Sequence, residues 1–135
     1  MSISILLVDD DLDDAELFCD ALVAADPDFK CHAARNGREA LDLLDKILIP
    51  SLIFLDLNMP VMNGWDCLKL LKSNALYKNI PVLMYSTSSN QNEKAIAADL
   101  GALGFITKPD DYGELKRILK VLTLQIKNGA VPNLI

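Results

Sequence analysis

The segment FLDLNMPVMNG, residues 54–64, decides the fold class because it joins an apolar strand to a helix through one short turn. The apolar run begins at Leu52, contains a single carboxylate, Asp56, near its end, and is followed by a turn from Pro60 to Gly64. A continuous apolar run is typical of a strand buried on both faces of a parallel sheet. A buried, unpaired carboxylate is costly, so we expect Asp56 to have a partner or a chemical task.

The same alternation of strand and helix extends in both directions from this segment. Apolar runs predict five strands, at residues 3–8, 29–34, 52–57, 80–85 and 103–107. Apolar residues at helical spacing predict five helices, at residues 12–26, 38–47, 64–73, 90–100 and 111–128. Strict alternation predicts a parallel sheet covered by helices on both faces, and five strands are too few for an eight-stranded barrel. We therefore predict a flavodoxin-like, doubly wound α/β fold with strand order 2-1-3-4-5, formed by residues 1–128, with a short tail at 129–135.

Length and charge exclude several classes of protein. The chain has 135 residues and is 51% hydrophobic, which is enough for the core of one domain. No stretch reaches the ~18 apolar residues of a membrane span, and the N-terminus lacks the basic region of a signal peptide, so we expect a cytoplasmic protein without a membrane partner. The net charge of −6 disfavours binding to a phosphate backbone, so no nucleic-acid partner is expected.

The cysteines and the histidine give little sign of chemistry. Cys19, Cys31 and Cys67 are odd in number and widely spaced, which indicates neither a disulfide framework nor a zinc site. We expect three reduced and mostly buried thiols. The single histidine, His32, rules out a metal site built on several imidazoles, and we expect it to be structural or exposed.

Polar side chains follow four of the five predicted strands. The first strand is followed by Asp9–Asp11, the third has Asp56 at its end, the fourth is followed by Ser86–Ser89 and the fifth by Lys108. In the order 2-1-3-4-5 these four strands are adjacent, so their carboxyl ends would bring acids, a hydroxyl and an amine to one edge of the sheet.

Such a group of side chains suits a metal ion and a phosphoryl group. Neighbouring carboxylates repel one another, and a divalent cation or an ammonium group relieves that repulsion. Mg²⁺ fits best, because it takes hard oxygen ligands and keeps several water molecules. With a lysine and a hydroxyl added, the site suits a phosphoryl group, and a nearby carboxylate can act as the nucleophile and form an aspartyl phosphate.

Four sequence blocks at these strand ends resemble the response regulator receiver domain of the CheY-like type, known from bacterial two-component systems. The blocks are LLVDDD, FLDLNMPVMNG, IPVLMYST and GFITKP, in the family's order, and the resemblance extends over roughly residues 3–128. It implies that Asp56 accepts a phosphoryl group from a histidine of a sensor kinase or of a histidine phosphotransfer protein. It also implies that the chain catalyses only its own phosphorylation and dephosphorylation.

The resemblance further implies a set of metal ligands. Asp10 would hold Mg²⁺ directly and Asp9 through water, with Asp56 and the backbone carbonyl of Asn58 completing the protein's share of the ligands. The neighbouring acids Asp11, Asp13 and Asp14 are interpreted as solvated charges that favour the start of the first helix.

The remaining implied roles concern the switch. Lys108 would pair with Asp56 or with a phosphoryl oxygen, while Ser86 and the backbone N–H of Thr87 would bind the phosphoryl group. Phe105 occupies the aromatic switch position, where many relatives have tyrosine. Lys108-Pro109 resembles a motif with a cis peptide bond.

Output is expected through protein contacts. Only the last helix and a short tail follow Lys108, so we expect a stand-alone receiver without a DNA-binding or enzymatic output domain. The switching face would be formed by the fourth helix, the fifth strand and the fifth helix, in a monomer or in a homodimer through that face. The apolar tail residues Val131, Leu134 and Ile135 are expected either to contact a partner or to be frayed.

Two other functions stay open. A Mg²⁺-dependent phosphohydrolase of the haloacid-dehalogenase type also uses an aspartate nucleophile, but it needs a second acid two positions later, where this chain has Asn58. A receiver-like binding module that works without phosphorylation is the other alternative, although every chemical position is intact.

Overall fold

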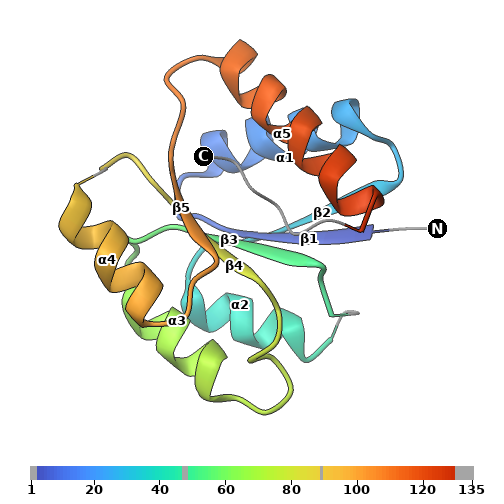
Figure 1. The fold of residues 1–135 in the computed structure, drawn as a ribbon. Helices are drawn as coiled ribbons and strands as arrows, with labels where there is room; N and C mark the ends of the chain where they lie inside the picture. The colour runs from blue at the N-terminus through green and yellow to red at the C-terminus, as the bar shows by residue number, and fades with distance from the viewer. Residues whose placement is uncertain (1–2, 47–48, 89, 130–135) are drawn as a thin grey trace.

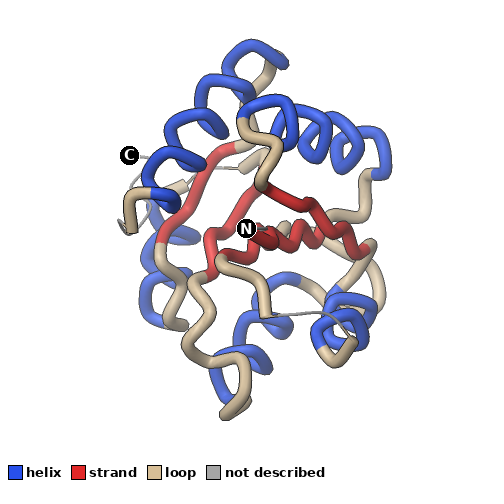
Figure 2. The backbone as a smooth tube through the Cα atoms, turned by 90° about the vertical axis from the view of Figure 1, so that its right-hand side faces the viewer, coloured by secondary structure: helices blue, strands red, loops and turns tan. Residues whose placement is uncertain are grey.

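A five-stranded parallel sheet forms the centre of the protein in the computed structural model, which describes residues 3–46, 49–88 and 90–129 (Figures 1 and 2). The strands lie in the order β2-β1-β3-β4-β5, as predicted. Their bounds are β1 Ile3–Val8, β2 Phe29–Ala34, β3 Leu52–Leu55, β4 Val82–Ser86 and β5 Gly104–Thr107. The helices in the described part of the chain are α1 Leu12–Ala25, α2 Gly37–Leu44, α3 Gly64–Ser73, α4 Gln91–Asp99 and α5 Tyr112–Lys127. The predicted doubly wound α/β fold is confirmed.

The helices form two layers on the sheet. Figure 1 shows α1 and α5 on one face and α2, α3 and α4 on the other. Alternate residues of β1 pack against opposite layers. Ile5 and Leu7 belong to the core beneath α1 and α5, whereas Leu6 and Val8 belong to the core on the opposite face. All four side chains are fully buried, which explains why the strand is apolar at each of these positions.

The fourth strand begins and ends later than predicted. We expected residues 80–85, but β4 runs from Val82 to Ser86. Pro81 has no N–H to donate, and it contributes only its carbonyl, which accepts a hydrogen bond from the N–H of Ile53 at 2.9 Å. The later end places Ser86 inside the sheet, where its carbonyl accepts the N–H of Lys108 at 2.8 Å.

Every helix begins with a side-chain cap. The side chains of Asp11, Asn36, Asn63, Asn90 and Asp111 each accept a backbone N–H from the first turn of the helix that follows. These caps let each helix start soon after the preceding strand ends. Each cap therefore fixes where its helix begins at this edge of the sheet.

The loop between β3 and α3 depends on backbone conformations that few residues tolerate. A Cβ atom at Gly64 would lie 2.3 Å from the carbonyl oxygen of Asp56, so only glycine fits there. Val61 has a φ of 70°, and the N–H of Met62 donates to the carbonyl of Pro60 at 2.7 Å across it. A positive φ is costly for a β-branched residue, so this loop stores strain next to Asp56.

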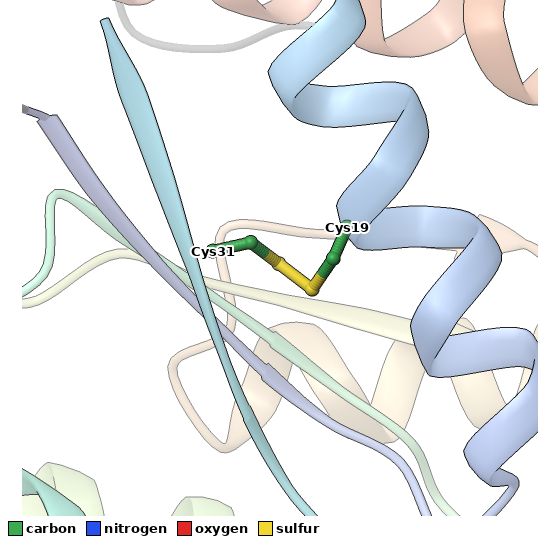
Figure 3. Close-up of a disulfide and its surroundings, with 2 residues drawn as sticks. All are labelled: Cys19 and Cys31. Carbon is green, nitrogen blue, oxygen red and sulfur yellow. A yellow bond between two sulfur atoms is a disulfide. The ribbon is translucent and has the colours of Figure 1, made fainter. Parts of the chain in front are cut away.

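Two of the three cysteines do not have the state we predicted. Cys19 of α1 and Cys31 of β2 form a disulfide, with their Cα atoms 5.4 Å apart (Figure 3). The prediction of three reduced thiols is wrong for this pair because α1 packs against β2, a tertiary contact that the spacing of the cysteines does not reveal. Cys67 is free and buried as expected, and burial raises the pKa of its thiol to about 11.

Three further expectations have simple outcomes. No helix in the described ranges is long and apolar enough to cross a membrane. His32 is half-buried in the edge strand β2, consistent with a structural role. The tail residues Val131, Leu134 and Ile135 lie outside the described residues.

Candidate functional site

The carboxyl edge of the sheet positions Asp56 through the backbone. Its N–H donates to the carbonyl of Val8 at 2.9 Å, which continues the pairing of β1 and β3 by one residue. The residue is only 6% exposed, and its Oδ2 lies 3.3 Å from Nζ of Lys108. Its Oδ1 accepts the N–H of Asn58 at 3.4 Å. The carboxylate in the apolar strand therefore has a partner, as its burial required.

Lys108 bridges two carboxylates that are far apart in the sequence. Its Nζ lies 2.8 Å from Oδ2 of Asp9 and 3.3 Å from Oδ2 of Asp56. Asp9 is almost fully buried, and its other oxygen accepts the N–H of Asp11 at 3.0 Å. The ammonium group thus offsets the charge of two acids that would otherwise repel each other.

Asp14 is a residue of this site that the sequence analysis missed. Asp11 caps α1 as expected, but the Oδ2 of Asp14 lies 3.7 Å from Nζ of Lys108, so Asp14 is not simply a solvated charge at the start of the helix. Its side chain is 47% exposed, which makes it the weakest of the three acidic partners of Lys108. The sequence feature that could have pointed to Asp14 is its place in the first turn of α1, shortly after the acids that follow β1.

Tyr85 was also missed. The Nζ of Lys108 lies 5.5 Å from the centre of the Tyr85 ring, within the range of a cation–π contact. Tyr85 also packs edge-on against Phe18 and Phe54, which connects the charged site to the core beneath α1 and α5. Its place directly before Ser86 in β4 puts the two side chains on opposite faces of the sheet.

The pKa values of the central pair reflect opposing effects. Burial raises the pKa of Asp56 to about 6, against the lowering effect of the Lys108 charge, while Asp9 raises it further. Burial alone would lower the pKa of Lys108, but the hydrogen bond to Asp9 and the charges of Asp9 and Asp56 raise it above its ordinary value. At neutral pH Asp56 is therefore mainly ionised and Lys108 is charged, which is the state that a carboxylate nucleophile needs.

Three carboxylates are placed to share a metal ion. Oxygen atoms of Asp9, Asp10 and Asp56 all lie within 4.8 Å of one another. Octahedral Mg²⁺ with Mg–O distances of about 2.1 Å holds its ligand oxygens roughly 3–4 Å apart, so small side-chain movements would close the site. Asp10 is exposed and leaves the site open to solvent. The donor set therefore fits a hard divalent cation. The carbonyl of Asn58 as a ligand stays a prediction.

The predicted switch residues lie on the face of the sheet that α3 and α4 cover. Ser86 is fully buried at the end of β4, and its hydroxyl lies 3.2 Å from that of Ser88. In the register of β4 and β5, Met84 pairs with Phe105, two pairs before Ser86 and Thr107, so Phe105 and Ser86 point to the same face. Phe105 is half-buried against the core on that side. Thr87 is exposed, and the binding role of its N–H stays a prediction.

The predicted cis bond between Lys108 and Pro109 is wrong. Every peptide bond in the described residues is trans. A trans X–Pro bond is favoured by roughly 0.5–1 kcal/mol unless the surrounding fold demands the other isomer. Here Lys108 contacts both Asp9 and Asp56 with the bond in trans.

Comparison with known proteins identifies the family. The sequence-family model of the response regulator receiver domain matches residues 5–120. The chain belongs to this family. Receiver domains bind Mg²⁺ through acidic residues, interact with histidine kinases or phosphotransfer proteins, and are in general signalling modules.

Solved receivers share the whole fold of this chain. The phosphorylated cyanobacterial phytochrome response regulator RcpA is 31% identical, with a TM-score of 0.87 over 97% of this chain and 98% of that chain. The chemotaxis protein CheY4 of Vibrio cholerae is 30% identical, with a TM-score of 0.78 over 93% and 98%. The Mn²⁺-bound response regulator Rcp1 is 27% identical, with a TM-score of 0.81 over 97% and 99%.

Some curated relatives are larger than this chain. The protein-glutamate methylesterase/protein-glutamine glutaminase of Clostridium acetobutylicum is 36% identical over 127 residues, which cover 93% of this chain and 36% of that protein. The probable transcriptional regulator ycf29 of Pyropia yezoensis is 32% identical over 135 residues, 98% of this chain and 60% of that protein. The chain spans about a third of the length of the methylesterase relatives.

Proposed function

We propose that this chain is the phosphoacceptor of a two-component phosphorelay, and that Asp56 takes a phosphoryl group from a phosphohistidine in a Mg²⁺-dependent reaction. The donor would be a sensor histidine kinase or a histidine phosphotransfer protein. The single observation that carries the proposal is the position of the Asp56 carboxylate. It is buried, lies 3.3 Å from a lysine ammonium, and is grouped with the oxygens of Asp9 and Asp10.

The transfer exchanges one bond to phosphorus for another. A carboxylate oxygen of Asp56 attacks the phosphorus atom, the bond from phosphorus to the histidine nitrogen breaks, and the imidazole leaves with that electron pair and takes up a proton. Lys108 favours this step by keeping Asp56 ionised despite its burial, and its ammonium then binds a phosphoryl oxygen. Bound Mg²⁺, held by Asp9, Asp10, Asp56 and the Asn58 carbonyl, would neutralise charge on the phosphoryl oxygens.

The signal would leave the site through Ser86 and Phe105. In this mechanism the Ser86 hydroxyl and the Thr87 N–H bind the remaining phosphoryl oxygens, and Phe105 follows Ser86 because both lie on the same face of the sheet. The population of conformers of the α4-β5-α5 face then shifts. That face carries a groove of about 540 Å³, lined among others by Lys94, Phe105 and Arg117.

The output would be contact with a downstream protein. The net charge of −6 supports a protein partner over nucleic acid. The α4-β5-α5 face would make this contact in a monomer or in a homodimer.

The proposal is tested with a small phosphodonor. Incubation with acetyl phosphate and Mg²⁺ should add the mass of one phosphoryl group to the intact protein, and chelation of Mg²⁺ should prevent the gain. Asp56→Asn should show no gain, because an amide is not a nucleophile here. Asp66→Asn, an exposed acid in the first turn of α3, is the matched control and should react like the parent. A parent without mass gain, or an Asp56→Asn variant that still gains the mass, would overturn the proposal.

A further inference from the structure

The hydroxyl of Ser86 is held by a chain of hydrogen bonds that leads away from Asp56. The Oγ of Ser88 lies 3.2 Å from the Oγ of Ser86 and donates to Oε2 of Glu93 at 3.2 Å. The N–H of Ser88 also donates to the Oγ of Ser86, at 3.3 Å. The chain therefore runs from the end of β4 to the first turn of α4.

The donor in each bond follows from the number of protons available. A carboxylate only accepts hydrogen bonds, so the single hydroxyl proton of Ser88 is used on Glu93. The bond between the two serine hydroxyls must then be donated by Ser86. The only hydroxyl proton of Ser86 is thus committed to Ser88.

Glu93 is itself fixed to the start of α4. Its Oε1 accepts from the side-chain amide of Asn90 at 2.7 Å, and its backbone N–H donates to Oδ1 of Asn90 at 2.8 Å. A negative charge in the first turn is also favoured by the helix dipole. The Glu93 end of this series of hydrogen bonds is therefore part of α4 and moves with the helix.

These bonds compete with the phosphoryl group. An oxygen on phosphorylated Asp56 would need the same hydroxyl proton that Ser86 gives to Ser88, and one proton cannot serve both acceptors. We propose that Ser88 and Glu93 form a latch that holds Ser86 in its resting orientation and ties its release to the first turn of α4. The latch rests on the proposed function of Asp56. Ser88 and Glu93 are positioning residues that act through Ser86.

The first test measures binding of beryllofluoride, a mimic of the phosphoryl group, in the presence of Mg²⁺ by ¹⁹F NMR. Loss of one hydrogen bond that opposes binding should raise the apparent affinity of Ser88→Ala and of Glu93→Ala roughly three- to tenfold. The double variant should gain no more than either single variant, because both break the same chain. Ser88→Thr, which keeps the hydroxyl, should bind like the parent.

A matched control separates the latch from general loosening of a helix start. Glu39 occupies the equivalent place in α2, three residues after the cap Asn36. The backbone N–H of Glu39 donates to Oδ1 of Asn36 at 2.8 Å. Glu39→Ala should leave the affinity unchanged. A gain in Glu39→Ala equal to that in Glu93→Ala would overturn the latch.

The second test needs no phosphorylation. Three-bond NMR couplings report the χ1 angle of Ser86 in the ligand-free protein, and Ser88→Ala should convert one dominant rotamer into a mixture. If the parent neither gains mass from acetyl phosphate nor binds beryllofluoride, but Ser86 is released in Ser88→Ala, the latch stands and the proposed function fails. If the parent reacts while affinity and χ1 are unchanged in the variants, the latch is overturned and the proposed function stands. Unchanged χ1 without any reaction overturns both.

Discussion

Helix α4 is attached to the sheet much less firmly than α1 and α5 on the opposite face. On one face, α1 and α5 each bury four side chains, including Phe18, Leu119 and Leu122. On the other face, α4 buries a single small one, Ala97. The weakly attached helix begins just after Ser86, and the firmly attached pair covers the strands that hold Asp9 and Asp56. The comparison teaches that α1 and α5 fix the geometry of the site, while α4 has few buried contacts to hold it in place.

The firm layer has three kinds of attachment. The rings of Phe18, Phe54 and Tyr85 pack edge-to-face with centroids 4.8 to 5.7 Å apart. The Cys19–Cys31 disulfide joins α1 to β2. Lys127, the last residue of α5, pairs with Asp26 at 2.8 Å, directly after α1. Each attachment is removed by one or two substitutions, and the expected losses decrease in that order.

The largest effect is expected from Phe18→Ala. Removing a fully buried ring leaves a cavity at the centre of the aromatic cluster, which should lower the free energy of unfolding by about 3–5 kcal/mol. Ile96→Ala, on α4, should cost less than about 0.5 kcal/mol because that side chain is 41% exposed. Urea unfolding at equilibrium measures both. Equal losses would show that α4 is attached as firmly as α1, contrary to the comparison.

The disulfide should give an intermediate effect. It closes a short loop, and its loss in a Cys19→Ser/Cys31→Ser variant should lower the free energy of unfolding by about 2–3 kcal/mol. Hydrogen exchange should quicken in α1 but not in α4. Reductant should destabilise the parent by the same amount and leave the double variant unchanged. Titration of thiols in the denatured, unreduced protein should find one, Cys67; a count of three would mean that the bond does not form.

The smallest effect is expected from Lys127→Met, because the Lys127 side chain is partly exposed and solvent screens its ion pair with Asp26. The hydrogen bond from Lys127 lowers the pKa of Asp26 below its ordinary value. A lowered acid pKa stabilises the fold fully above the unfolded value, and this contribution is lost as the pH falls through the folded value. The urea midpoint of the variant should therefore be slightly below that of the parent at pH 7, and the gap should narrow as the pH falls below the ordinary pKa of an aspartate, about 3.9. Lys120→Met, on the same helix, is the control. A gap that does not narrow on acidification would contradict this origin.

The chain's own sequence determined the elements, their order and the chemical residues of the site. Apolar periodicity reports which side of a local segment is buried, and the polar residues after the strands marked the edge where Asp9, Asp10, Asp56 and Lys108 meet. Helix starts are equally local, since the side chains of Asn90 and Asp111 cap α4 and α5 from the residue directly before each helix.

Only the tertiary structure decided which side chains meet at that edge and in what state. The Cys19–Cys31 bond depends on how α1 packs on β2, and the contact of Asp14 with Lys108 depends on the direction in which α1 leaves β1. The direction of the Ser86 hydroxyl depends on Glu93 of a different element. Local patterns fix which residues face inward, but they do not fix the distances between elements. Hydrogen bonds, ion pairs and disulfides form only at those distances, so their partners were settled by packing.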